Sequence, residues 1–208
     1  MPDRVAKPVH LLFIFLLLAL PALGEEPCAI SFPHDSNPTE ITDQDICNFH
    51  RVDGEVYRGG RPSLSAYPKL AKLGIRTIVN LEETESAEKE RAAVAKLNLN
   101  LTPEQRIKFI SFPISQVEIS RTGISDERVK NLFQEIRMAP KPVFIHCFYG
   151  KDRTGAVVVL YRMVRQQMSF QEAYEEAFHY RFSQEDLGLK AVMDRYKNPR
   201  KLNTLRLP

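Results

Sequence analysis

The chain has 208 residues, of which 43% are hydrophobic and 26% charged, and its 29 basic side chains exceed its 26 acidic ones by three. This near balance gives no support for nucleic-acid binding, which usually requires a strongly basic surface. The five histidines and three cysteines form neither a C-x-x-C pair nor an H-E-x-x-H helix, so the sequence predicts no metal site and no cofactor.

Residues 1–24 have the organisation of a secretory signal peptide. Arg4 and Lys7 precede an unbroken apolar run at 11–20, and the small residues Ala22 and Gly24 follow it. The run is shorter than the about 20 apolar residues of a membrane span. We therefore expect cleavage after Gly24, a periplasmic or secreted protein, and no membrane attachment after cleavage. A retained membrane anchor is the alternative.

Residues 25–53 are rich in proline and short polar side chains, a composition typical of irregular structure. We expect them to form an N-terminal arm laid over a single folded domain at 54–208, which is long enough for one core. In an oxidising compartment Cys28 and Cys47 could form a disulfide that fixes the arm. The sequence leaves open whether they are bridged, and it does not indicate the oligomeric state.

Hydrophobic periodicity beyond residue 53 predicts alternating helices and strands. The expected strands are 75–81, 107–114 and 143–147. The expected helices are 65–73, 82–97, 126–138, 154–168, 170–179 and 185–196. Because strands alternate with helices, we expect an α/β fold in which a central, mostly parallel sheet is flanked by helices on both faces. The glutamates of helix 82–97 are expected mainly on its solvent face.

The sequence HCFYGKDRTG, at 146–155, lies between the strand at 143–147 and the helix at 154–168. A loop that ends on a helix N-terminus presents unpaired backbone N–H groups and the positive end of the helix dipole, so it can bind a phosphate. A glycine within such a loop permits a tight curl. The predicted phosphate-binding residues are Phe148, Tyr149, Gly150, Lys151, Asp152 and Arg153. A P-loop NTPase is excluded, because the glycine spacing of that motif is missing.

Three side chains in this stretch predict hydrolysis of a phosphate ester through a covalent cysteine. A thiol titrates near ~8.5, but at a helix N-terminus beside cations its pKa can fall to roughly 3.5–7.5, which makes Cys147 a candidate thiolate nucleophile. The planar guanidinium of Arg153 can bind two phosphoryl oxygens. The hydroxyl of Thr154 is placed by its spacing to donate to the Cys147 sulfur when that sulfur leaves.

The stretch resembles the signature of cysteine-dependent protein tyrosine phosphatases in their small dual-specificity-like form. The resemblance extends to VYRGGRP at 56–62 and IRTIVNL at 75–81, and it covers the chain from about Asp53 onward. It implies a dual-specificity-phosphatase-like core at 54–208, with the phosphate-binding loop between a strand and a helix. By resemblance, Cys147 is the nucleophile and Arg153 the phosphate ligand. Arg58 and Arg61 either add to anion binding or are solvated turn residues.

The general acid departs from the family pattern. Such enzymes usually carry an Asp on a mobile loop about thirty residues before the Cys, but FPISQVE at 112–118 contains none. Asp152 ranks first as a substitute, because some bacterial tyrosine and lipid phosphatases have a Lys-Asp-Arg loop. The alternatives are Glu118, which otherwise is a solvated loop residue, and Asp126, which otherwise belongs to a helix N-terminus. Asp152 could instead orient Arg153.

The substrate remains open between two chemical classes. With a signal peptide and a lysine in the loop, the chain resembles bacterial cysteine phytases, which remove phosphates from inositol polyphosphates. Lys151 could pair with a second phosphate on the same ring, whereas Tyr149 could flank the ring of a phosphotyrosyl protein. Because the usual acid is missing, a phosphate-binding pseudophosphatase is the hypothesis from another class.

Overall fold

A computed structural model describes residues 40–206 of the chain. The predicted signal peptide and Cys28 lie outside the described residues. The five strands are β1 (His50–Arg51), β2 (Val56–Gly59), β3 (Thr77–Asn80), β4 (Lys108–Ser111) and β5 (Val143–His146). They form one sheet in the order β1-β2-β5-β3-β4, in which β1 is antiparallel to β2 and the other pairs are parallel. The predicted mostly parallel sheet is confirmed.

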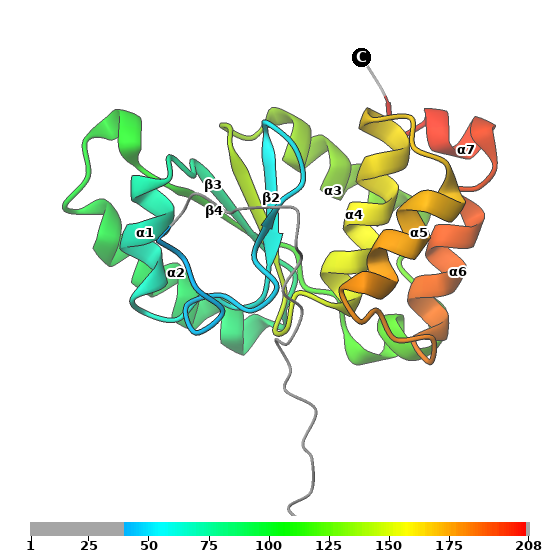
Figure 1. Ribbon diagram of the computed structural model, residues 1–208, viewed down its shortest axis with the longest axis horizontal. Coiled ribbons are helices and arrows are strands. Elements are labelled where there is room, and N and C mark those ends of the chain that lie inside the picture. Colours follow the sequence, from blue (N-terminus) through cyan, green and yellow to red (C-terminus); the bar gives the residue numbers. More distant parts are fainter. Residues whose placement is uncertain (1–39, 207–208) are drawn as a thin grey trace, which may run out of the picture.

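Helices cover both faces of this sheet (Figure 1), as the sequence predicts. They are α1 (Ala66–Lys72), α2 (Thr84–Asn98), α3 (Asp126–Met138), α4 (Asp152–Arg165), α5 (Phe170–His179), α6 (Leu187–Arg195) and α7 (Pro199–Asn203). A 3-10 turn, η1 (Pro103–Gln105), and a π-helical turn, η2 (Glu118–Thr122), complete the described elements. In Figure 1, α1 and α2 lie on one side of the sheet, and α4 to α7 lie on the other.

The central strand β5 carries the active-site sequence. All four of its residues are buried, and its register places it between β2 and β3. Val143 and Ile145 pack on the α3 and α4 side, whereas Phe144 packs on the α1 side, as expected from alternation along a strand. Because β2 and β3 are separated by β5, the chain after β5 leaves at the crevice where parallel sheets bind ligands.

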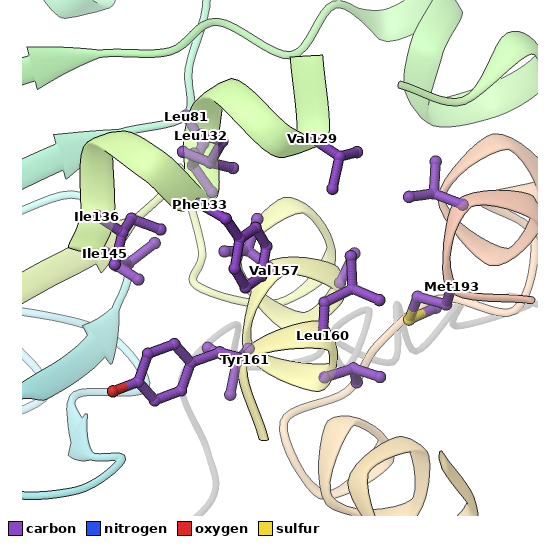
Figure 2. Close-up of a cluster of buried hydrophobic side chains, with 14 of the residues drawn as sticks. Leu81, Val129, Leu132, Phe133, Ile136, Ile145, Val157, Leu160, Tyr161 and Met193 are labelled. Carbon is purple, nitrogen blue, oxygen red and sulfur yellow. The ribbon is translucent and has the colours of Figure 1, made fainter. Parts of the chain in front are cut away.

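The larger core lies between the sheet, α3 and α4 (Figure 2). It contains Leu132 and Phe133 of α3 against Val157, Leu160 and Tyr161 of α4. Residues 154–161 of α4 are all buried, so this helix is enclosed by the sheet, α3, α5 and α6. The β-branched run 157–159 favours a strand by itself, but burial on all sides of a helix outweighs that preference.

Three differences from the sequence prediction concern short elements. The strand predicted at 107–114 is limited to Lys108–Ser111, and η2 occupies part of the segment that follows it. Residues 45–53, within the predicted arm, contribute β1 and the buried side chains of Ile46 and Phe49.

Among residues 40–206, none of the helices has the length and apolar character needed to span a membrane. The same residues form no His, Cys, Asp or Glu grouping suited to a metal ion.

Candidate active site

The loop at 147–151 joins β5 to α4, and three of its consecutive carbonyl groups are bonded on the outside of the loop. The bonds are Arg61 N to Phe148 O (3.0 Å), Asn48 Nδ2 to Tyr149 O (2.9 Å) and Arg58 Nη2 to Gly150 O (2.6 Å). In a trans peptide the carbonyl and the next N–H point in opposite directions, so the N–H groups of 149–151 face the centre of the loop. None of them donates a hydrogen bond to another described residue. The loop is therefore an anion cradle made by the main chain.

Gly150 is required in this loop for two separate reasons. Its φ is +71°, in the left-handed region that side chains disfavour. A Cβ at this position would also lie 2.4 Å from the carbonyl carbon of Gly59 and 2.6 Å from the nitrogen of Gly60. The loop can therefore pack against the end of β2 only if residue 150 has no side chain.

Arg58 braces the loop from behind. It is only 1% exposed, and its guanidinium carbon lies 3.6 Å from the centre of the Tyr180 ring. Burial lowers the pKa of Arg58 to about 10, so it still carries its charge at neutral pH. The alternative that Arg58 is a solvated turn residue is therefore wrong. Arg61 is bound to Glu82 and lies over the Phe148 ring, so it supports the rim of the loop.

The predicted nucleophile and phosphate ligand meet at this loop. Cys147 is a free thiol, 4% exposed, at the end of β5. Arg153, in the first turn of α4, donates from Nε to Ile114 O at 2.9 Å. This bond fixes one edge of the guanidinium, while Nη1 and Nη2 have no hydrogen-bond partner within residues 40–206 and can bind two phosphoryl oxygens. The charge of Arg153 and the α4 N-terminus both favour an anion here.

Thr154 is fully buried in the first turn of α4, and its hydroxyl oxygen has no hydrogen-bond partner in the described part of the chain. No bond to the Cys147 sulfur is present. Its predicted role as a donor to the leaving thiolate therefore stays a prediction. A fully buried hydroxyl without a partner is costly, so its presence beside the loop favours a function in the reaction.

A buried polar network under the loop was missed by the sequence prediction, which placed the glutamates of α2 mainly in solvent. Glu90 is buried, 3.0 Å from His146 Nε2, and accepts a hydrogen bond from Asn80 Nδ2 at 2.5 Å. Burial raises the pKa of Glu90, but the contacts with His146 and Asn80 outweigh it and keep the pKa below the ordinary value. The network joins α2 to the ends of β3 and β5, and so fixes the residue that precedes Cys147.

Glu118 is held as a carboxylate by Ser115 and Arg128. Its carboxylate accepts from the backbone N–H and hydroxyl of Ser115, both at 2.9 Å, and is paired with Arg128. Burial raises the pKa of Glu118, but the Ser115 and Arg128 contacts lower it further, so the pKa lies below the ordinary value. The interpretation of Glu118 as a solvated loop residue is also wrong, because it holds the start of η2.

Asp126 is a structural residue at the start of α3. Ser125 caps the helix, and the Asp126 carboxylate contacts Lys201 at 2.6 Å and Arg195 at 3.5 Å. The hydrogen bond from Lys201 and the charge of Arg195 lower the pKa of Asp126. It therefore ties α3 to the C-terminal helices and stays ionised, which agrees with the alternative of a helix N-terminal residue.

Asp152 is the first residue of α4 and the neighbour of Arg153, directly after the loop. One of its oxygens accepts from Ser183 N at 2.8 Å. Lys151, the N-cap of α4, is half-buried, and its Nζ lies 5.9 Å from the Tyr149 ring. The phosphate-binding set predicted from the sequence lies in the loop and the first two residues of α4.

Cys47 takes part in a disulfide. The other residue of the predicted pair, Cys28, lies outside the described residues, so the pairing stays a prediction. The backbone of Cys47 matters directly to the site, because its carbonyl accepts from Gly60 N at 2.6 Å. This bond anchors the segment 45–49 beneath the turn that supports the loop.

Residues 45–206 match the model of the tyrosine phosphatase family, which covers well over half of the chain. The chain belongs to this family. It is a family of phosphoric monoester hydrolases, and the resemblance carried by HCFYGKDRTG is confirmed.

Individual relatives agree with this membership. The dual specificity protein phosphatase TpbA of Pseudomonas aeruginosa is 26% identical over 142 residues, which are 67% of this chain and 57% of TpbA. The inositol diphosphatase DSP5 of Arabidopsis thaliana is 29% identical over 143 residues, 67% of this chain and 66% of DSP5. The chain thus spans less than two thirds of the length of these relatives.

Solved structures confirm the fold. The crystal structure of P. aeruginosa TpbA superposes with a TM-score of 0.60 at 24% identity, covering 81% of this chain and 93% of TpbA. The Siw14 catalytic core superposes with a TM-score of 0.59 at 20% identity, covering 75% and 88%. The predicted dual-specificity-phosphatase-like core is therefore confirmed.

Proposed function

We propose that this family member is an exported phosphomonoester hydrolase that acts through a phosphocysteine on inositol polyphosphates. The observation that carries the proposal is that the loop and the first turn of the helix after it carry three inward N–H groups, the Cys147 thiol and an Arg153 guanidinium whose Nη atoms are not bound within residues 40–206. Export rests on residues 1–24 alone. N-terminal sequencing of protein recovered from the periplasm or medium tests it, and a start at Glu25 is expected.

The reaction has two steps. The Cys147 sulfur attacks phosphorus, the bond to the leaving oxygen breaks, and that oxygen takes a proton from Asp152. Water then attacks the phosphocysteine, gives a proton to Asp152 and releases the thiolate and inorganic phosphate. The N–H groups of 149–151 and the Arg153 fork stabilise the phosphoryl oxygens as charge develops on them.

Two observations bear on the substrate. Relatives named inositol diphosphatases are 27 to 30% identical to this chain, and Lys151, half-buried at the N-cap of α4, supplies a cation that can pair with a second phosphate. A dual-specificity substrate is favoured by the likeness to TpbA and by Phe148 and Tyr149. These residues are 44% and 42% exposed, and the centres of their rings lie 4.4 Å apart, edge to face.

Replacing Lys151 by alanine separates these substrates. We expect kcat/KM for inositol hexakisphosphate to fall about tenfold, because a charge-assisted contact to a second phosphate contributes about 1.5 kcal/mol. The loss in kcat/KM should be smaller at high salt, because salt screens the attraction between Lys151 and the substrate phosphates. Activity on a phosphotyrosyl peptide should change much less.

The matched control is Lys96→Ala, which removes an exposed lysine of α2 and should leave kcat/KM for both substrates unchanged. An equal loss on both substrates in Lys151→Ala, or a wild-type preference for the peptide, would assign the protein to phosphoprotein substrates instead. A folded, reduced wild type that hydrolyses neither substrate nor p-nitrophenyl phosphate would be a phosphate-binding pseudophosphatase.

A further inference from the structure

A cavity lies at the end of the sheet opposite the phosphate-binding loop. Its lining comes from the C-terminal parts of α3 and α4, the residues just before β2 and β5, and the turn after α7. Its volume is about 470 Å³, within the range of about 300–1,000 Å³ that small-molecule sites occupy. The helix α4 begins beside the loop at Asp152 and ends beside the cavity at Arg165, about 20 Å further along its axis. The cavity is therefore separate from the active site described above.

Part of the lining is apolar. Four hydrophobic side chains contribute to it, each of them at most 7% exposed: Phe133, Ile136, Val164 and Leu205. Phe133 and Ile136 also belong to the core between α3 and α4 (Figure 2), so this part of the cavity is the outer surface of that core. Water beside such side chains has few hydrogen-bond partners, and an apolar group that displaces it gains free energy.

The charged part of the lining is mainly basic. Among the described residues that line the cavity, Glu55 carries the one carboxylate, against the four cations Arg137, Lys141, Arg165 and Arg206. The Glu55 carboxylate lies 3.7 Å from Arg165, so these two charges offset each other. The other three cations give the cavity a net positive charge.

Two of these cations retain hydrogen-bonding capacity. The Lys141 ammonium has three donors and gives one bond within residues 40–206, to Ile136 O. Burial is the largest influence on the pKa of Lys141 and lowers it, although Glu55 and Asp53 act in the opposite direction. The exposed Arg206 guanidinium has no hydrogen-bond or ion-pair partner in the described part of the chain. Acidic oxygens from a ligand would therefore satisfy donors of both side chains.

We propose that this cavity is a second binding site, and that its ligand is a small amphipathic organic acid with one acidic head and an apolar body. Lys141 and Arg206 bind the head by charge-assisted hydrogen bonds, and the apolar side chains of α3 and α4 contact the body. A small polyphosphate suits the cavity less well, because it cannot cover the apolar lining. An uncharged apolar molecule would leave the cations without partners. The site requires no hydrolase activity.

The test is calorimetric titration of the protein with octanoate, octanesulfonate, hexanoate and 1-octanol, with inorganic phosphate present to fill the phosphate-binding loop. We expect octanoate or octanesulfonate to bind one to one, and the tighter of the two identifies a planar or a tetrahedral head. Octanoate should bind about tenfold more tightly than hexanoate, because it has two more methylene groups to bury. Octanol, which lacks the charge, should bind at least about tenfold more weakly than the better acid.

Substitutions locate the binding. Lys141→Ala and Arg206→Ala should each raise Kd for the better acid about tenfold, whereas Lys96→Ala, on α2, should not change it. Arg206 is exposed after the last helix, so its replacement tests the site even if Lys141→Ala fails to fold.

A further variant keeps this inference separate from the proposed function. Cys147→Ser should bind the acid as tightly as wild type, whether or not the wild type hydrolyses a phosphate ester. NMR shifts on binding should be largest for the methyl groups of Val164 and Leu205. The inference would be overturned by no binding of either acid at about 1 mM, by equal Kd for hexanoate and octanoate, or by wild-type Kd in Arg206→Ala and Lys141→Ala.

Discussion

Replacing Gly150 by alanine should reduce kcat/KM on p-nitrophenyl phosphate at least about a hundredfold. The φ of +71° costs about 1–2 kcal/mol for any residue with a Cβ. The added Cβ would also overlap the backbone of Gly59 and Gly60, so the loop must move away from β2. That movement breaks the bond from Arg58 to Gly150 O and turns the N–H groups out of the phosphate site.

Alanine substitutions at two other glycines distinguish backbone strain from steric overlap as the cause of this loss. Gly74 has a φ of +89° but open space around a Cβ, so Gly74→Ala should lower stability by about 1 kcal/mol and leave kcat/KM unchanged. A Cβ at Gly54 would have only Arg51 Nη2 nearby, at 3.7 Å, so Gly54→Ala should change neither stability nor kcat/KM. A folded Gly150→Ala protein with wild-type kcat/KM would show that the loop does not bind phosphate through its main chain.

Replacing Arg153 by lysine should lower kcat/KM by about a hundredfold to a thousandfold. Lysine keeps the positive charge but loses the planar fork that can bind two phosphoryl oxygens. It also cannot keep both the Ile114 carbonyl bond and a bidentate contact to phosphate, because it ends in a single nitrogen. Removal of one preorganised donor to a developing oxyanion typically costs this much in rate.

The stability of Arg153→Lys should change little, because Arg153 is half-buried and its one hydrogen bond within residues 40–206 is to a carbonyl. Arg91→Lys is the matched control, since Arg91 is exposed on α2 and is paired with Glu88 on the surface. Equal activity of Arg153→Lys and Arg91→Lys would mean that charge alone holds the phosphate, and the bidentate role would be wrong.

The reactive loop could be predicted from the sequence because its parts are contiguous. HCFYGKDRTG contains the nucleophile, the curl at Gly150 and the arginine, and the apolar runs on either side predict a buried strand and a helix. The mostly parallel sheet with helices on both faces followed from the alternation of strands and helices, but the order of the strands did not. Helix bounds at 126–138 and 170–179 agree with α3 and α5 as the structure has them.

The supports of the loop could not be predicted in the same way. Arg58 and Asn48 bind loop carbonyls from 92 and 101 residues away in the chain, and no local pattern marks such contacts. Glu90 belongs to a helix whose Glu85 and Glu88 are exposed, and it is buried where the ends of β3 and β5 supply Asn80 and His146. Ser183 N donates to Asp152 from 31 residues away, and that bond depends on how the chain between α5 and α6 packs against α4.

Trapping phosphate on the protein tests covalent catalysis most directly. The wild type should be mixed with p-nitrophenyl phosphate, quenched in acid within a turnover and digested for mass spectrometry. We expect one phosphorylated peptide, with phosphate on Cys147, and no phosphopeptide or turnover in Cys147→Ser. Turnover that persists in Cys147→Ser, or phosphate trapped on any other residue, would contradict the assignment of Cys147 as the nucleophile.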